Sequence, residues 1–531
     1  MKKTLLMLVA FMATMTAFAS AEEEGWQKSF TPVASADDLD GVHTAVASDG
    51  SVFASSTYNQ AFTLGDVTVA DPEGLTSSCV LKFDKDGNAK WAVTLLGKCY
   101  VHAMAADTDG TLYVAGQSQD IKVVATGTDG KHYEIDNPTS DPWGEGPEVA
   151  GYSAFILKIT KDGLVDAVKV MSPITEPDIA TAEFPMYIAL DILSIQPYQL
   201  KIDGDKIYMS ARYTGTLKEG NDQTIWMAAY VIVDGFMRVD NTSMGVLSLD
   251  KAGLTNIYSE AIIQSEDILT AEKQYYPEAV TFFVKENVVN VAFIGFGNLY
   301  VHGRNGGRSF NFQTTDDESG NKEHGLVFLN NSTMENKIYH AEMHNRDAVP
   351  YNLTGGEVLG GDKVFIGGTF YGNFPLTETV EPSPITKTVN TAFFASLEFT
   401  PYTFGVNWSW VNDAESQATC MVVTGEEIHA ATTAAMYTLK TANGELKDTM
   451  EQGFEDASSY NDQYVSTIFT KDNSVTVFSP KLKPSGINST KAAMKNANAK
   501  FYNVNGMELA APQKGLNIIK TDDGVKKVSV K

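Results

Sequence analysis

Short runs of apolar and β-branched residues, each broken by an acidic glycine turn, make up most of the chain. In the clearest pair, 42–56 and 101–116, an apolar strand, an Asp-Gly turn and a second apolar strand follow one another. A second hairpin of the same kind follows each of them, at 78–95 and 153–170. Apolar strands around Asp-Gly turns are the pattern of β-hairpins. The sequence therefore predicts an all-β protein built from paired hairpins.

The two-hairpin unit recurs about every 60 residues along the rest of the chain. Its later copies lie at 200–258, 280–343, 355–399, 420–447 and, with one hairpin only, at 464–479. Four antiparallel strands repeated in this way predict the blades of a β-propeller. Seven four-stranded blades are the favoured count, with six or eight blades and tandem β-sandwiches as the alternatives.

The incomplete last unit has a candidate partner at the other end of the chain. The segment around Trp26, EGWQKSFTPV, is similar to the strand around Trp91, AKWAVTLLG. An N-terminal strand that completes the last blade would close the ring and protect its edge. We therefore expect residues 22–480 to form one closed propeller.

The first residues have the pattern of a secretory signal peptide. Lys2 and Lys3 precede an apolar run that ends at Phe18, and Ala19-Ser20-Ala21 and three glutamates follow it. The run is shorter than the about 18 apolar residues that a membrane span needs, and it ends in acidic rather than basic residues. We expect cleavage of residues 1–21, no transmembrane segment, and an exported protein at the outer surface, outside the cell or in the periplasm.

The C-terminal part predicts a linker and a small β module. Residues 481–499 are polar and rich in Ser, Asn, Ala and Lys, as in a linker. Residues 500–531 hold short strands that turn on Asn505-Gly506 and Asp523-Gly524. A module of this size is too small to be stable without docking or a covalent staple.

Three stretches of the chain resemble the bacterial seven-bladed propeller repeat known as SBBP. They are DTDGTLYVAG at Asp107, GGTFYGNFP at Gly367 and SAFILKI at Ser153. These are similar to the repeat's Asp-Gly turn and aromatic-Val-x-Gly strand, its Gly-Thr-aromatic stretch and its Ala-Phe-x-x-Lys strand. The resemblance implies a propeller and an extracellular or surface location, and it implies no reaction.

The tail resembles the C-terminal module of secreted Bacteroidales proteins, a short form of the type IX secretion sorting domain. Pro512-Gln513-Lys514-Gly515 fits that module, whereas Asn517 stands where an aromatic residue is usual. The resemblance implies sorting or attachment through the secretion machinery. The alternative is a structural appendage that packs on the propeller.

Charge and cysteine content exclude some functions. The formal net charge is −26 and is spread along the chain, which disfavours nucleic acid and anionic membranes as partners. Cys79, Cys99 and Cys420 are too few for a disulfide framework, although a Cys79–Cys99 disulfide remains open. No C-x-x-C spacing supports a zinc ribbon or a redox site.

Candidate binding residues lie in the long connections between the second and third strands of the units. These connections are 117–151, 217–244, 302–325 and 375–390, whereas the turns on the opposite rim are tight. Long loops on a rigid scaffold usually carry binding groups. Aromatic rings and arginines suit sugars, carboxylates and peptides, so the candidates are Trp143, Trp226, Arg304 and Arg308. The alternative for each is packing within its own loop.

No motif predicts catalysis, a metal or a cofactor. The acidic turns at 84–87 and 107–110 lack the terminal glutamate of a calcium loop and are explained by turn chemistry. His43 and His102 hold equivalent places, one residue out of register, and could line the axis; we interpret them as structural. Nucleophile elbows, phosphate loops, zincin motifs and dinucleotide fingerprints are absent from the sequence.

The sequence therefore predicts an exported, non-catalytic binding or scaffold propeller. Its ligand, a glycan or a protein, would sit on the rim of long loops. The alternative is a glycan-active hydrolase or lyase, which would need two carboxyl groups about 5 to 9.5 Å apart in the axial cleft.

Overall fold

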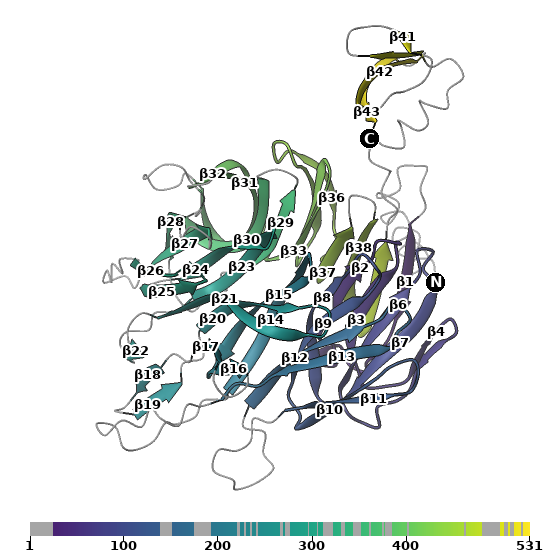
Figure 1. Cartoon of the computed structure of the whole chain (residues 1–531), viewed down its shortest axis with the longest axis vertical. Coiled ribbons are helices and arrows are strands. Elements are labelled where there is room, and N and C mark those ends of the chain that lie inside the picture. Colours follow the sequence, from purple (N-terminus) through teal and green to yellow (C-terminus); the bar gives the residue numbers. More distant parts are fainter. Residues whose placement is uncertain are drawn as a thin grey trace, which may run out of the picture.

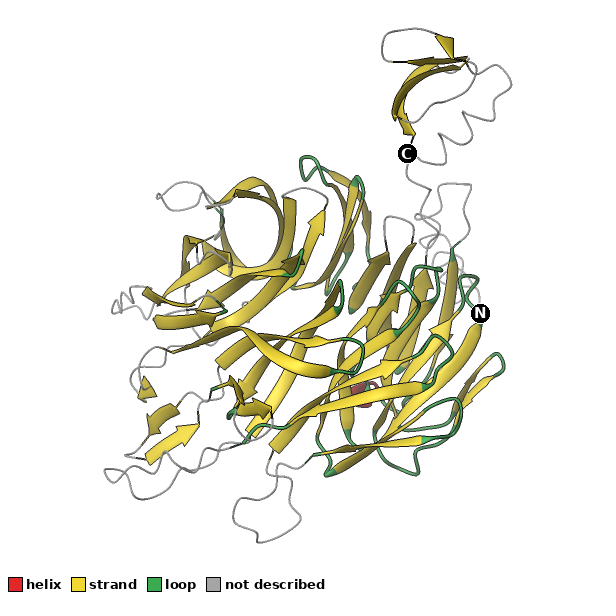
Figure 2. Cartoon of the chain, viewed as in Figure 1, coloured by secondary structure: helices red, strands yellow, loops and turns green. Residues whose placement is uncertain are grey.

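β-Strands and tight turns make up almost all of the described structure. The computed structural model describes residues 25–137, 151–174, 193–479 with short gaps within 220–402 and at 461–463, and strands within 500–530. Figure 2 shows one short 3-10 helix, Ala36–Asp38, in this part of the chain. None of its helices has the length and hydropathy of a membrane span. The predicted all-β class is confirmed.

Among the described residues six of the sheets stand around a common axis, and together they supply seven central strands (Figure 1). Neighbouring central strands contact one another around the axis, and the last contacts the first. In ring order they are β2 (His43–Val46), β8 (Cys99–Ala106), β14 (Leu193–Asp203), β23 (Pro277–Lys285), β29 (Asn352–Leu359), β33 (Ala418–Thr424) and β37 (Asp456–Tyr460). A closed ring of antiparallel sheets that run outward from an axis is a β-propeller.

Four sheets of the ring have four strands each. From the axis outward, the first is β37–β38 (Tyr464–Lys471)–β39 (Ser474–Ser479)–β1 (Trp26–Phe30), whose outermost strand comes from the N-terminal segment. The second is β23–β24 (Val288–Gly295)–β27 (Lys322–Asn330)–β28 (Glu335–Met343). The third is β29–β30 (Lys363–Asn373)–β31 (Thr386–Thr400)–β32 (Thr403–Val411), and the fourth is β33–β34 (Glu427–Thr432)–β35 (Met436–Lys440)–β36 (Leu446–Met450).

Two sheets of the ring are larger. The six-stranded sheet is β2–β3 (Val52–Tyr58)–β6 (Ser77–Phe83)–β7 (Ala89–Leu96)–β10 (Lys122–Thr126)–β11 (His132–Asp136). The ten-stranded sheet is β8–β9 (Leu112–Ser118)–β12 (Gly151–Ile159)–β14–β15 (Lys206–Thr214)–β20 (Ser243–Asp250)–β21 (Thr255–Ser265)–β25 (Asn298–Gly303)–β26 (Gly306–Asn311), and β13 (Val165–Met171) also pairs with β12.

The expected seven separate four-stranded blades are not found as seven sheets. Among the described residues five sheets have four strands, and one of these belongs to the tail. The difference has two physical causes. Hairpins from the long connections extend the outer edges of neighbouring sheets, and β12 pairs in parallel with β14 through Gly151–Leu193 and Tyr152–Ser194, which joins two units.

The predicted closure of the ring by the N-terminal segment is confirmed. β1 pairs antiparallel with β39, with Trp26 opposite Ser479 and Phe30 opposite Val475. β1 also contacts the first unit, because the Phe30 ring stacks on Phe62 at 5.3 Å between centroids. Strand β1 from the N-terminal segment and the strands of the last unit therefore belong to one sheet.

The long connections form hairpins that pair with the preceding unit. β10 and β11 lie between β9 and β12 in the chain, yet β10 pairs with β7. In the same way β26 and β25 lie between β24 and β27, yet β25 pairs with β21. The hairpin of β16 (Leu217–Glu219) and β17 (Gln223–Trp226) reaches β13 through an ion pair of Lys169 and Glu219 at 3.1 Å. These hairpins cover edge strands that would otherwise be unpaired.

Smaller sheets complete the described structure. They are β4 (Phe62–Leu64)–β5 (Val67–Val69), β19 (Phe236–Val239)–β18 (Tyr230–Val233)–β22 (Leu269–Thr270), and in the tail β41 (Glu508–Leu509)–β40 (Lys500–Asn503)–β42 (Gly515–Thr521)–β43 (Gly524–Val530). In the tail β42 pairs antiparallel with β43, with Thr521 opposite Gly524. Cys79, Cys99 and Cys420 are buried free thiols, so the structure contains no Cys79–Cys99 disulfide.

Candidate functional site

A cavity of about 680 Å³ lies on the axis of the ring. All the central strands contribute to its wall, because a strand turns every second side chain to one face. Its polar groups include those of His43, His102, Tyr198, Lys201, Asp456 and Tyr460, and much of the remaining wall is alanine, methionine, leucine and valine. This volume and mixed lining are typical of small-ligand sites.

Irregular pairing on several central strands changes the side chains that face the axis. The register shifts by one residue between Val101 and Ala103 on β8, as in a β-bulge that leaves His102 as the extra residue. Corresponding shifts leave Tyr198 as the extra residue on β14 and Thr419 on β33. β-Bulges redirect side chains and are frequent beside functional sites. His102, Tyr198 and Thr419 all line the cavity.

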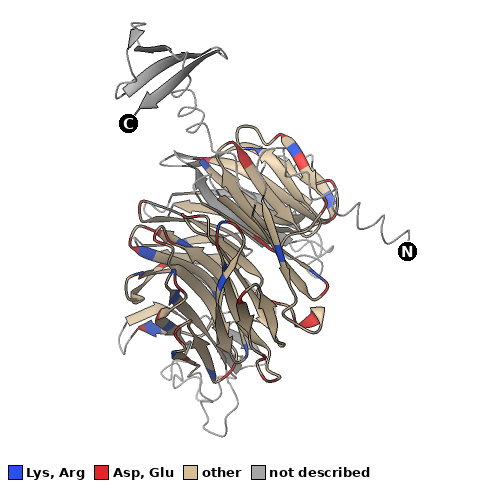
Figure 3. Cartoon of the chain, turned by 90° about the vertical axis from the view of Figure 1, so that its right-hand side faces the viewer, with Lys and Arg blue, Asp and Glu red and all other residues tan. Residues whose placement is uncertain are grey.

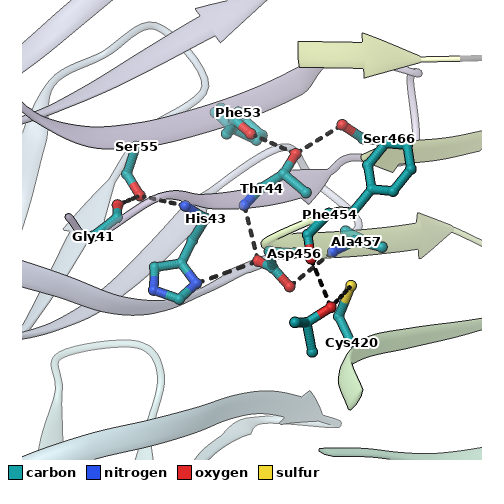
Figure 4. A network of polar contacts seen from close by, with 12 residues as sticks. Gly41, His43, Thr44, Phe53, Ser55, Cys420, Phe454, Asp456, Ala457 and Ser466 are labelled. Atoms are coloured by element: carbon teal, nitrogen blue, oxygen red, sulfur yellow. Dashed lines mark hydrogen bonds and ion pairs between the residues drawn. The ribbon is translucent and has the colours of Figure 1, made fainter. Parts of the chain in front are cut away.

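Figure 4 shows an ion pair in the wall between the first and last central strands. Nδ1 of His43 lies 3.4 Å from Oδ2 of Asp456. The same carboxylate oxygen accepts the backbone N–H of Thr44 at 3.0 Å, and Oδ1 accepts the N–H of Ala457 at 2.8 Å. Asp456 therefore joins β2 to β37 and orients the His43 ring toward the cavity wall.

His102 lacks the partners that its neighbour has. Its Nε2 is buried and has no hydrogen-bond partner among the described residues. Burial lowers the pKa of His102 to about 4, and the nearby His43 adds to the effect. The ring is therefore neutral at pH 7, with one donor and one acceptor nitrogen. A buried polar atom without a partner is costly, so a ligand group that pairs with this nitrogen would gain the lost hydrogen bond.

This low pKa predicts acid sensitivity of the fold. An unfolded His102 takes up a proton near its ordinary pKa of about 6.5, whereas the folded one resists until about pH 4. Stability should therefore fall as the pH drops through this window, by about 2 kcal/mol between pH 7.5 and pH 5. Urea unfolding at both pH values should show that His102→Gln removes this part of the loss. An equal loss in both proteins would contradict the neutral buried state.

The cavity wall does not provide a reactive cysteine. Burial raises the pKa of the Cys420 thiol well above its usual value, and the charges of Asp456 and Glu455 raise it further. A thiol that stays protonated is a poor nucleophile. Thr419 instead uses its hydroxyl structurally, by donating to the carbonyl oxygen of Phe454 at 2.6 Å.

The carboxylates of the wall do not form a hydrolytic pair among the described side chains. The acidic residues of the described wall are Glu455 and Asp456, and Asp456 is already held by the backbone N–H groups of Thr44 and Ala457. Glu455 accepts a hydrogen bond from the Thr470 hydroxyl at 2.9 Å. This arrangement gives no support to the glycan-active hydrolase or lyase.

Of the four binding candidates from the sequence, the three in the described part of the chain are not gathered at one site. Trp143 lies outside the described residues. Trp226 is fully buried and stacks on Tyr213 with ring centroids 4.8 Å apart, which is the geometry of a packing residue. The physical reason is that its hairpin folds back onto β15 and β20, where Tyr213 and Gly245 pack against the indole. Arg308 is exposed on β26, with its guanidinium 6.0 Å from the Phe310 ring.

Arg304 lies in a separate groove on the outer part of the ten-stranded sheet. It forms an ion pair with Glu260 at 2.6 Å, and Lys206 and Tyr258 line the same groove. Figure 3 shows acidic and basic residues spread over turns and strand ends. Lys206, Tyr258 and Asp456 carry no motif in the sequence, because what brings each of them into its site is pairing between strands far apart in the chain.

Comparison with known proteins finds likeness in fold only. No family model matches the chain, and no curated protein matches its sequence. The β-propeller domain of Cps50 (Swd1) from Myceliophteria thermophila is similar with a TM-score of 0.36 and 8% identity, over 85% of this chain and 99% of that one. The extracellular region of plexin A4 gives 0.31 and 8%, over 86% and 47%.

A catalytically inactive virginiamycin B lyase from Staphylococcus aureus, solved with quinupristin, gives a TM-score of 0.29 and 10% identity, over 77% of this chain and 96% of that one. At these scores no property of those proteins carries over to this chain. The class that the ring and its cavity define is an all-β propeller with an axial cavity, and this rests on the strand order itself.

Proposed function

We propose that the protein is an exported, non-catalytic binding protein that takes a glycan or a segment of a protein into its axial cavity. The single observation that carries this proposal is the buried, unpartnered Nε2 of His102 in the wall of that cavity. A native protein rarely leaves such an atom without a hydrogen bond, and a ligand is one way to supply it. The cavity thereby replaces the loop rim as the proposed site.

The rest of the wall suits a ligand with both apolar and polar parts. Tyr198 is 39% exposed and can present its ring to a sugar face or an apolar side chain. His43, held by Asp456, and the ammonium group of Lys201 add polar groups beside the alanine and methionine side chains. A few placed polar groups in a largely apolar wall fix the orientation of a ligand.

The proposal also includes the architecture and location expected from the sequence. The six-stranded sheet is taken as one four-stranded unit with an added hairpin, and the ten-stranded sheet as two units with another. Together with the four four-stranded sheets of the ring, this gives seven units. Export is supported by the signal pattern of residues 1–21, and attachment or sorting by the module at 500–531.

The test begins with the mature chain on glycan and peptide arrays, followed by calorimetry with the captured ligand. Replacing His102 by Ala should weaken binding about tenfold, because one hydrogen bond to a buried group is lost. His132→Ala is the matched control, since His132 is exposed on β11 outside the cavity, and it should leave affinity unchanged. Binding that survives His102→Ala but is lost in Arg308→Ala would move the site to the loop hairpins.

A further inference from the structure

The outer groove around Arg304 is independent of the axial cavity. Lys206, Gln223, Thr224, Tyr258, Ser259 and Arg304 line it, and none of them lines the cavity on the axis. Lys206 begins β15, Gln223 and Thr224 belong to β17, Tyr258 and Ser259 belong to β21, and Arg304 follows β25. The groove therefore forms where a loop hairpin and an added strand meet the outer edge of one unit.

Two cations share one aromatic ring in this groove. The Lys206 ammonium lies 4.5 Å from the centroid of the Tyr258 ring, and the Arg304 guanidinium carbon lies 5.6 Å from it. Cations are attracted to the face of an aromatic ring, so Tyr258 holds both of them at the surface. The ring itself is 40% exposed, which leaves the cations accessible to solvent.

A buried carboxylate orients Arg304 from below. Glu260 is 2% exposed and accepts hydrogen bonds from Arg304 at 2.6 Å and from the Ser248 hydroxyl at 2.5 Å. A guanidinium has five N–H donors, so this contact leaves others available to a ligand. Lys206 forms no ion pair among the described residues, and its one recorded partner is the Tyr258 ring.

The balance of charges selects the kind of anion. Glu260 contacts Arg304 directly. Asp250, opposite Lys206 in the strand register, and Asp205, which precedes Lys206, add further negative charge nearby. These nearby carboxylates repel a doubly charged phosphate more strongly than a singly charged carboxylate, so the two cations suit a carboxylate better. The hydroxyls of Thr224 and Ser259 and the amide of Gln223 beside it suit a ligand that is itself rich in hydroxyl groups.

We propose that this groove binds the carboxylate of a uronic acid unit in an acidic glycan. The Lys206 ammonium and the free N–H groups of Arg304 would hold the carboxylate. Gln223, Thr224 and Ser259 would hydrogen-bond to ring hydroxyls of the same sugar. This second site does not depend on what the axial cavity binds.

The test uses trigalacturonic acid as probe, titrated into the full mature chain at low salt. Lys206→Gln should weaken binding about tenfold, and so should full methyl esterification of the probe, because both remove the charge pair. High salt should weaken binding by screening. Lys131→Gln is the matched control. Lys131 is exposed and forms its ion pair with Asp129 in the turn between β10 and β11, outside the groove.

Arg304→Lys tests the guanidinium without leaving the buried Glu260 unpaired, as Arg304→Ala would. We expect weaker binding with an unchanged urea midpoint. Failure of trigalacturonic acid to bind at millimolar concentration would overturn the proposal. So would equal binding of the methyl ester, or tighter binding of inorganic phosphate or an oligo-aspartate peptide. His102→Ala should have no effect here, which separates this result from the test of the axial cavity.

Discussion

Deleting residues 22–31 should destabilise the propeller by about 5 kcal/mol or more, because β1 carries buried side chains and covers an edge strand at once. β1 supplies the outer strand of the last unit, with Phe30 buried and opposite Val475. Trp26 reaches the first unit, where its indole N–H donates to the carbonyl oxygen of Lys85 at 3.1 Å. Loss of the strand therefore opens the ring between its first and last units.

Point variants on β1 distinguish the loss of buried side chains from the loss of the strand itself in the deletion. Phe30→Ala should cost about 3 kcal/mol, as for a buried phenylalanine, whereas Gln27→Ala, on the exposed side of the strand, should cost little. Urea unfolding followed by tryptophan fluorescence measures all three proteins. A deletion with an unchanged midpoint would show that β39 does not need β1.

Replacing Trp226 by alanine should cost about 3 to 5 kcal/mol of stability, because the side chain is fully buried. Its ring stacks on Tyr213, and it lies so close to Gly245 that a Cβ added there would be 2.6 Å from the indole. Gly245→Ala should therefore also destabilise this contact. The adjacent Met227 is 45% exposed, and Met227→Ala is the matched control with little expected effect.

Urea unfolding of the Trp226→Ala variant decides between the two roles of this residue. A large loss of stability would confirm that Trp226 packs the β16–β17 hairpin on β15 and β20. A small loss of stability together with lost ligand binding would instead restore the interpretation of Trp226 as a ligand anchor.

Local turn chemistry made most of the fold predictable. Gly87, Gly110 and Gly163 follow aspartates in the predicted hairpin turns, and their φ angles of 80°, 84° and 83° need glycine. Closure was also predictable, because the last unit visibly lacked strands and the Trp26 segment matched the strand around Trp91. Both signals lie within a few residues of the feature that they predict.

Long-range pairing was not predictable from these patterns. Nothing in the residues of β10 indicates that its partner is β7 rather than a strand of its own unit. Loop length likewise does not show where a loop hairpin packs: Trp226, on the β16–β17 hairpin, is buried against Tyr213 and Gly245. The axial position of His43 and His102 was expected, but the missing partner of His102 depends on strands far away in the chain.

The hairpins that reach back to the preceding unit also set an order for folding during synthesis. Each such unit is completed only after the hairpin of the next unit has emerged, so native structure follows the ribosome with a lag of about one unit. β1 is the extreme case, since it leaves the ribosome first and its partner β39 is made more than 440 residues later. Until β39 has been made, β1 has no native partner strand, and its unpaired edge can pair with other strands instead.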